Sequence, residues 1–179
     1  MKSTNYEFNV VDEKERHKLL VEFNDNSVDY PTDVTVQELF EQQVEKTPDN
    51  IAVIYEDKKL TYRELNERAN AVAKVLIAKG VQADDIVGIM VETSIEMLVQ
   101  ILAILKAGGA YMPIDQQYPD DRIAYMLEDS KAKLLLTQEK FEDRIKYQVN
   151  ICDISKENVD ENDNCNLGKT SDEYCFNSI

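Results

Sequence analysis

The stretch LKAGGAYMPID, residues 105–115, restricts the fold more than any other part of the sequence. The apolar residues before it contain no helix breaker, and Gly108 or Gly109 can adopt the left-handed conformation that ends a helix. The residues after the glycines read as a short strand, in which Pro113 predicts an edge or strand-end position. We therefore expect a helix, a glycine stop and a strand that ends in an acid, Asp115.

Strands and helices alternate along the rest of the chain. The expected strands are residues 51–55, 59–62, 86–91, 110–114, 134–137 and 149–154. The run 86–91 is apolar almost throughout, which is typical of a strand buried on both faces of a parallel sheet. The pattern predicts an α/β fold, with a largely parallel sheet and helices on both of its faces.

Helix starts and faces follow from local signals. Three pairs have the spacing of a reciprocal capping box, namely Thr35 with Glu38, Thr61 with Glu64 and Thr93 with Glu96. Pro119 is expected at the first position of another helix. In the helix after Thr61 the pattern buries Leu65, Ala69, Val72 and Leu76, and it directs to water Arg63, Glu67, Asn70 and Lys74.

Composition divides the chain into three parts. Residues 1–34 read as a leader with helical spacing over 12–23, residues 35–155 as the α/β part, and residues 156–179 as a polar, acidic loop or disordered tail. The last residues, 174–179, are weakly strand-like.

Charge and hydropathy exclude several classes of partner. The net charge of −15 argues against nucleic acid or an anionic membrane surface. No segment approaches the ~20 apolar residues of a membrane span, and the polar N-terminus does not resemble a signal peptide. The three cysteines are not spaced as in a zinc site and are interpreted as cytosolic free thiols. A cytoplasmic location is therefore expected.

Two motifs resemble those of the adenylation domains of nonribosomal peptide synthetases. Residues 105–115 resemble that family's LKAGxAYVPIDP motif, and LTYRELN at residues 60–66 resembles its LTYxEL motif. Residues 19–25 look like part of the linker that follows a condensation domain, and residues 35–53 like the first helix and strand of the adenylation domain. The resemblance covers about residues 12–140. It implies the N-terminal subdomain of an adenylate-forming enzyme, preceded by a helical linker over residues 1–34.

The resemblance also implies an activity. Such enzymes use ATP and magnesium to convert an amino acid into an aminoacyl-adenylate, and then transfer the aminoacyl group to the phosphopantetheine thiol of a carrier domain. The implied partners are the rest of the adenylation domain and the neighbouring condensation and carrier domains.

The family's phosphate loop has no counterpart among the residues. None of the five glycines lies in a loop resembling TSGTTGxPKG, and residues 171–179 occupy the place of the strand that precedes this loop. We therefore assign no catalytic, cofactor-binding or metal-binding residue, and expect this chain to be inactive alone.

Several acidic and nucleophilic residues could in principle bind a metal or ligand, or take part in catalysis, in place of the family's missing groups. The pairs Asp84-Asp85 and Asp120-Asp121 favour turns and helix starts over metal binding. Asp115 ends a strand, where ligand-binding groups often sit in α/β sheets, although structural support is the preferred interpretation. The preferred roles of the remaining candidates are helix-end charge compensation for Lys106, a surface position for His17, and no nucleophilic role for Cys175.

Two alternatives remain open. One is a non-catalytic subdomain that acts as an interaction or docking module, in which an uncovered face and sheet edge favour self-association. The other is an acyl-CoA or aryl ligase of the same superfamily.

Overall fold

The computed structural model describes residues 11–28 and 33–157. The chain divides into two compact units, residues 1–33 and 34–179, and each is described by itself. In the first unit, α1 (Glu13–Leu20) is followed by the 3-10 turn η1 (Glu22–Asn24). The Asp12 carboxylate caps α1 by accepting from the backbone N–H of Glu15 at 2.7 Å. The predicted helix is therefore present, and its apolar residues Leu20 and Phe23 are exposed.

The second unit begins with two elements that start from capping boxes. Helix α2 (Val36–Lys46) is capped by Thr35 with Glu38, as the sequence predicts. Strands β1 (Ile51–Tyr55) and β2 (Lys58–Thr61) form an antiparallel hairpin. The next helix, α3 (Tyr62–Ala78), starts from the second predicted box, Thr61 with Glu64. The cap lowers the pKa of the Glu64 carboxyl, because the backbone and hydroxyl of Thr61 donate hydrogen bonds to it.

The remaining strands form one parallel sheet in the order β4-β3-β5-β6. Its strands are β3 (Ile86–Met90), β4 (Ala110–Pro113), β5 (Leu134–Thr137) and β6 (Asn150–Cys152). The helical elements of this part are α4 (Ile95–Lys106), α5 (Asp120–Asp129), α6 (Glu139–Glu142) and the 3-10 turn η2 (Ile154–Lys156). Pro113 lies in the edge strand β4, as predicted.

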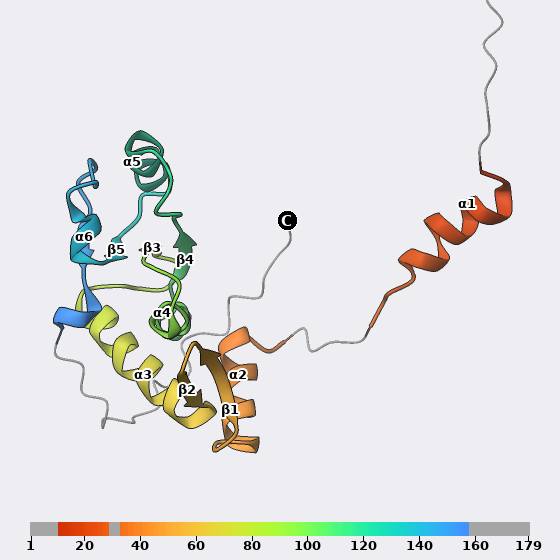
Figure 1. Cartoon of the computed structure of the whole chain (residues 1–179), viewed down its shortest axis with the longest axis horizontal. Coiled ribbons are helices and arrows are strands. Elements are labelled where there is room, and N and C mark those ends of the chain that lie inside the picture. The colour runs from red at the N-terminus through yellow and green to blue at the C-terminus, as the bar shows by residue number, and fades with distance from the viewer. Residues whose placement is uncertain (1–10, 29–32, 158–179) are drawn as a thin grey trace, which may run out of the picture. The chain divides into compact units, whose positions relative to one another are not determined.

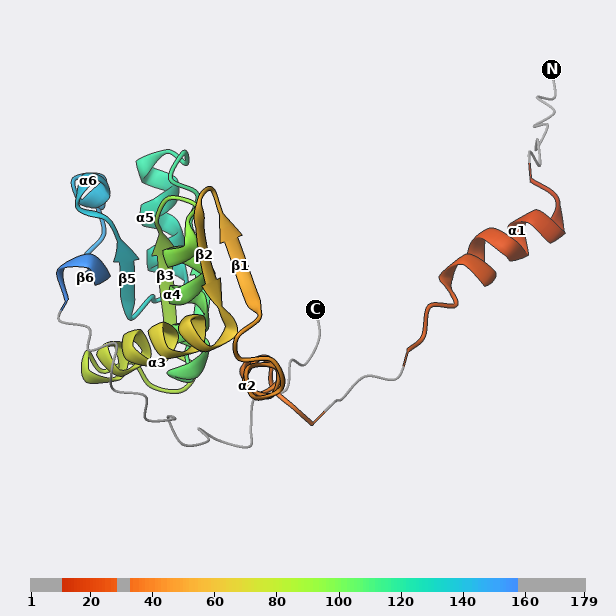
Figure 2. The ribbon, with the colours of Figure 1, turned by 60° about the horizontal axis from the view of Figure 1, so that its bottom comes forward.

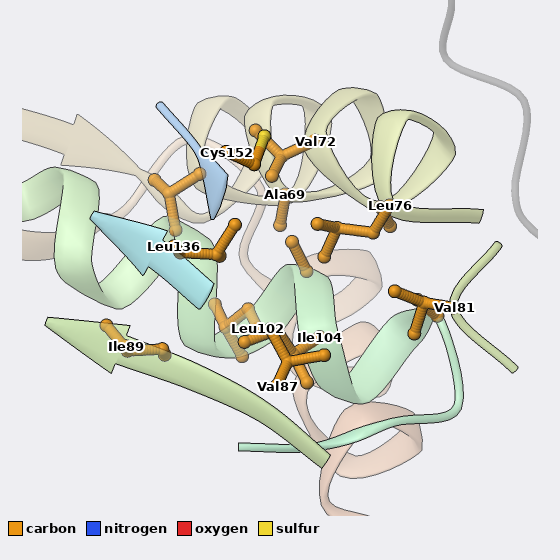
Figure 3. Packing of buried hydrophobic residues seen from close by; sticks show 14 of the residues in the cluster. Ala69, Val72, Leu76, Val81, Val87, Ile89, Leu102, Ile104, Leu136 and Cys152 are labelled. Atoms are coloured by element: carbon orange, nitrogen blue, oxygen red, sulfur yellow. The ribbon is translucent and has the colours of Figure 1, made fainter. Parts of the chain in front are cut away.

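Helices cover both faces of this sheet, which confirms the predicted fold class. Helices α3 and α4 lie on one face and α5 on the other (Figures 1 and 2). Side chains alternate along β5 accordingly: Leu134 and Leu136 join the core with α3 and α4, whereas Leu135 joins the core with α5. Figure 3 shows the first core, where Leu76 and Val72 of α3 face Leu102 and Ile104 of α4 above Val87.

The predicted glycine stop has a defined geometry. Gly108 is the left-handed residue, with φ +83°. Its N–H donates to Leu105 O at 3.1 Å, and the N–H of Gly109 donates to Ile104 O at 3.0 Å. This is the Schellman pattern, in which the residues after a helix satisfy its last carbonyls. A Cβ at Gly109 would lie 3.0 Å from the carbonyl oxygen of Asp85, so this second glycine permits a close backbone approach.

The same pattern ends α5 with a lysine, and this offers a paired test. Lys131 has φ +52°, and the N–H of Ala132 donates to Leu127 O at 3.2 Å. Gly108→Ala should lower the free energy of unfolding by about 1–2 kcal/mol, because only the backbone conformation resists a methyl group there. Lys131→Gly should leave it unchanged or raise it by up to about 1 kcal/mol. Urea denaturation measures both, and equal effects of the two substitutions would contradict the explanation.

Three predictions are wrong: the exposed side of helix α3 and the starting residues of helices α4 and α5. Asn70 does not face water but is buried, with 1% of its surface exposed. The cap of α4 is Ser94, whose hydroxyl accepts from the N–H of Met97 at 3.3 Å, and not Thr93. Pro119 occupies the cap position of α5, one residue before the first helical position. The starts of α4 and α5 are each displaced by one residue from the predicted position. The buried face of α3 is wider than the predicted stripe and includes Asn70.

Within the described residues, no helix combines the length and apolar character needed to cross a membrane.

Candidate functional site

The carboxyl edge of the parallel sheet is the place where this class of fold positions ligand-binding groups. In the order β4-β3-β5-β6, the chain leaves β3 toward β4 on one side and leaves β5 toward β6 on the other. The strand order therefore reverses between β3 and β5, and open α/β sheets bind ligands at such a switch point. Glu92 follows β3 and Gln138 follows β5 at this position.

Side chains of the fold itself bridge this switch point. The backbone N–H of Glu92 donates to Gln138 Oε1 at 3.4 Å, and Lys140 Nζ lies 2.5 Å from Glu92 Oε1. Below them the buried Thr137 hydroxyl donates to Met90 O at 2.8 Å, which ties the ends of β5 and β3 together. The polar groups at the switch point thus bind one another across the two strands.

Asp115 lies where the sequence places it, just beyond β4. Its Oδ1 accepts from the backbone N–H of Gln117 at 2.8 Å, which closes a turn. The same loop is held by Arg144, which donates to the carbonyl oxygens of Gln116 and Tyr118 and, at 3.0 Å, to Asp120 Oδ1. Asp115 and Arg144 therefore fix the loop between β4 and α5. Arg144 could not be recognised from its sequence context, because two of its three partners are backbone carbonyls and all three are more than 20 residues away.

The two acid pairs also serve local structure. Asp85 Oδ2 accepts from the N–H of Gln82 at 2.9 Å, and the N–H of Asp84 donates to Gly108 O at 3.0 Å. Asp120 and Asp121 both pair with Lys146, at 3.6 and 3.3 Å. Hydrogen bonding to Asp121 raises the pKa of Lys146. Over residues 11–28 and 33–157, no three His, Cys, Asp or Glu side chains come together as a metal site.

Lys106 does more than compensate the charge at the end of α4, because its ammonium is buried and contacts residues of α2. Its side chain is only 3% exposed, its ammonium forms an ion pair with Glu41 of α2, and Nζ lies 6.0 Å from the centre of the Phe40 ring. This pair joins the end of α4 to α2. Sequence reasoning missed it because the two residues are 65 positions apart.

Three buried amides were also missed. Asn66, Asn70 and Gln100 are each at least nine-tenths buried, and each has a side-chain oxygen with no hydrogen-bond partner among the described contacts. Asn66 and Asn70 are neighbours at i and i+4 on α3.

Neither the described histidine, His17, nor the described cysteine, Cys152, lies in a catalytic arrangement. His17 is exposed on α1. Cys152 is buried at the end of β6 as a free thiol, and burial raises its pKa to about 11. A thiol with a raised pKa is a poor nucleophile. Cys165, Cys175 and the strand-like residues 174–179 lie outside the described residues.

The described glycines do not fit a phosphate cradle. Gly80 and Gly108 end helices with positive φ, Gly109 packs against the Asp85 carbonyl, and a Cβ at Gly88 would lie 2.9 Å from the Leu135 side chain. None of these four opens a loop at a helix N-terminus, where backbone N–H groups could bind a phosphate. A shallow depression of about 250 Å³ is lined by Leu60, Glu64, Glu67 and Arg68. Arg68 is paired there with both Glu96 oxygens, at 2.6 and 2.7 Å.

Comparison with known proteins points to one family. The family described as "AMP-binding enzyme" matches residues 40–173. Gramicidin S synthase 2 of Brevibacillus brevis is 50% identical over 161 residues, which are 90% of this chain and 4% of the synthase. Tyrocidine synthase 2 of Brevibacillus parabrevis is 56% identical over 135 residues, which are 75% of this chain and again 4% of the synthase.

The solved structures that resemble this chain include nonribosomal peptide synthetases as well. The nonribosomal peptide synthetase FmoA3 superimposes with a TM-score of 0.70 at 33% identity, over 85% of this chain and 16% of that one. The N-terminal subdomain of Klebsiella oxytoca NpsA superimposes with a TM-score of 0.61 at 29% identity, over 65% of this chain and 30% of that one. This chain therefore spans a small part of the proteins that it matches.

Proposed function

Because this chain belongs to the AMP-binding enzyme family, we propose that it forms the N-terminal part of an adenylation domain that activates an amino acid for nonribosomal peptide synthesis. The observation that carries the proposal is the 50% identity to gramicidin S synthase 2 over 90% of this chain. The helix stop at Gly108 and the close approach at Gly109 give the motif of residues 105–115 a structural role within that scaffold.

The chemistry of such a domain requires groups beyond the described residues. ATP, magnesium and a carrier-bound phosphopantetheine are the proposed reactants and cofactors of the whole enzyme. The four described glycines do not form a phosphate cradle, so we assign no step of the reaction to them. The proposed contribution of this chain is a sheet whose edge loops are fixed by Arg144 and by the Lys140–Glu92 pair. Its proposed partners are the rest of the adenylation domain and the condensation and carrier domains, in the cytoplasm.

The proposal predicts that this chain binds no nucleotide alone and acquires activity only in a complex. Isothermal titration with ATP and magnesium should show no binding, and amino-acid-dependent pyrophosphate exchange should be absent. Exchange should appear when the chain is mixed with the complementary remainder of the adenylation domain of gramicidin S synthase 2. The matched control is the same mixture with a Leu136→Asp chain, whose sheet cannot pack. Saturable micromolar ATP binding by the chain alone, or equal exchange with the control, would contradict the proposal.

Two alternatives rest on specific observations. The exposed Leu20 and Phe23 of the first unit support an interaction module, which sedimentation would reveal as association that increases with concentration. A monomer at all concentrations would count against that module. An aryl ligase is supported by NpsA, whose structure in complex with 3-hydroxyanthranilyl-AMSN superimposes at 26% identity with a TM-score of 0.68.

A further inference from the structure

Three amide side chains lie inside the layer that α3 and α4 form on one face of the sheet. Asn70 is 1% exposed, and Asn66 and Gln100 are 8% and 7% exposed. Within the described part of the chain, their side-chain oxygens and the Asn70 nitrogen have no hydrogen-bond partner. A buried amide that gives up its hydration without gaining a partner is costly, and folded proteins satisfy nearly all such groups. These atoms therefore indicate a bound partner.

Asn66 and Asn70 share one side of α3. They are four residues apart, which places their Cβ atoms about 5–6 Å from each other. Their amides do not bond each other, because Asn66 Oδ1 and both polar atoms of Asn70 are among the unpaired atoms of the described residues. A small molecule that both donates and accepts hydrogen bonds can bridge two side chains at this spacing.

Gln100 lies on the side of α4 that is turned toward α3. It follows Glu96 by one helical turn, and Arg68 of α3 binds both Glu96 oxygens, at 2.6 and 2.7 Å. Arg68 lies between Asn66 and Asn70 in the sequence of α3. The ion pair thus holds this part of α4 against the stretch of α3 that carries the two asparagines, and the buried Gln100 amide lies at the same contact between the helices.

The unpaired atoms favour a ligand that donates hydrogen bonds, because they comprise three oxygens and one nitrogen. Carboxylate and phosphate oxygens only accept, so an anion would leave the amide oxygens unpaired. About two water molecules suffice, since they supply four hydrogens and one of them can accept from Asn70 Nδ2. The nearby side chains of Ala69, Ala73 and Ala103 are fully buried and short, which leaves room beside the amides.

We propose that Asn66, Asn70 and Gln100 bind about two internal water molecules between α3 and α4. Elsewhere these helices pack through apolar side chains such as Leu76 and Ile104 (Figure 3). Apolar contacts tolerate repacking, whereas a satisfied buried polar network specifies one arrangement. The bound water therefore fixes how α3 packs on α4. The site does not depend on the proposed function, because all of its residues belong to this chain.

Oxygen-17 relaxation dispersion tests the site directly, because it counts the water molecules that stay inside a protein for longer than nanoseconds. The wild-type chain should hold about two more of them than Asn70→Leu, whose side chain is similar in size and has no polar atom. Asn50→Leu makes the same substitution at an exposed asparagine and should keep the wild-type count. Asn66→Leu and Gln100→Met, at less deeply buried positions, provide the same comparison if Asn70→Leu does not fold. Equal counts in the wild type and in the buried variants would overturn the proposal.

Urea denaturation gives a second readout, because residues that share bound water must be coupled. Asn66→Leu should lower the folding equilibrium constant about tenfold in the wild type. In the Asn70→Leu background, where the water is already lost, it should lower the constant about twofold or less. In the Asn50→Leu background the loss should again be about tenfold. Equal losses in all three backgrounds would contradict a shared site. Stability that differs between potassium chloride and choline chloride would identify a bound cation and overturn the assignment to water.

Discussion

Replacing Leu136 with alanine is expected to lower the free energy of unfolding by about 3–5 kcal/mol. Leu136 lies in β5, between β3 and β6, and its side chain is fully buried. It fills the space between the sheet and helices α3 and α4 (Figure 3). Removing three carbons there leaves a cavity that neighbouring strands hold open, because two of them pair with the same strand.

The loss should appear as a lower urea midpoint with an unchanged slope. Leu136→Val deletes less volume and should cost about 1 kcal/mol, so it remains measurable if the alanine variant unfolds. The matched control is Leu39→Ala on α2, whose side chain is 42% exposed and should cost about 1 kcal/mol or less. Similar losses at Leu136 and Leu39 would contradict the assignment of the main core to this face of the sheet.

The second large effect concerns the ion pair between Lys106 and Glu41. Glu41→Gln should lower the free energy of unfolding by about 2–4 kcal/mol, because it leaves the 3%-exposed ammonium of Lys106 without a counter-charge. Lys106→Met removes the buried charge and keeps the apolar stem beside Phe40, so it should cost about 1 kcal/mol or less. The two partners of one ion pair should therefore give unequal results.

A double-mutant cycle measured by urea denaturation separates this explanation from a general weakening of α2. Glu41→Gln should add almost nothing in the Lys106→Met background, since no buried charge remains to be compensated. Glu45→Gln makes the same substitution on the exposed face of α2 and should be neutral within about 0.5 kcal/mol. An equal cost for Glu41→Gln with and without Lys106 would rule out the charge as the cause.

The family and the fold class were predictable because both depend on local strings. The motifs at residues 60–66 and 105–115 identified nonribosomal peptide synthetase adenylation domains, and the comparisons confirm that identification. The Thr35 and Thr61 capping boxes were found because the two groups that bind each other are three residues apart. The alternation of strands and helices along the chain was enough to predict the parallel sheet.

The errors occurred where a second element decides the environment. Asn70 was placed in water because its neighbours define a narrower apolar stripe, yet it is one of the buried residues of α3. Thr93 and Ser94 are both good caps, and only the first turn of α4 determines which hydroxyl receives a backbone N–H. Lys106, Glu41 and Arg144 make contacts across more than 20 positions, which periodicity cannot detect.

Pro113 has a consequence for how molecules of this protein can associate. Ala110 and Ile114 donate their N–H groups inward, to Asp85 O and Ile89 O, so the alternate residues Tyr111 and Pro113 present their backbone outward. Proline has no N–H, and Tyr111 is left as the single outward donor of β4. A strand from another molecule could therefore accept only one backbone hydrogen bond from the outer edge of β4. The pyrrolidine ring of Pro113 therefore disfavours amyloid-like stacking through β4.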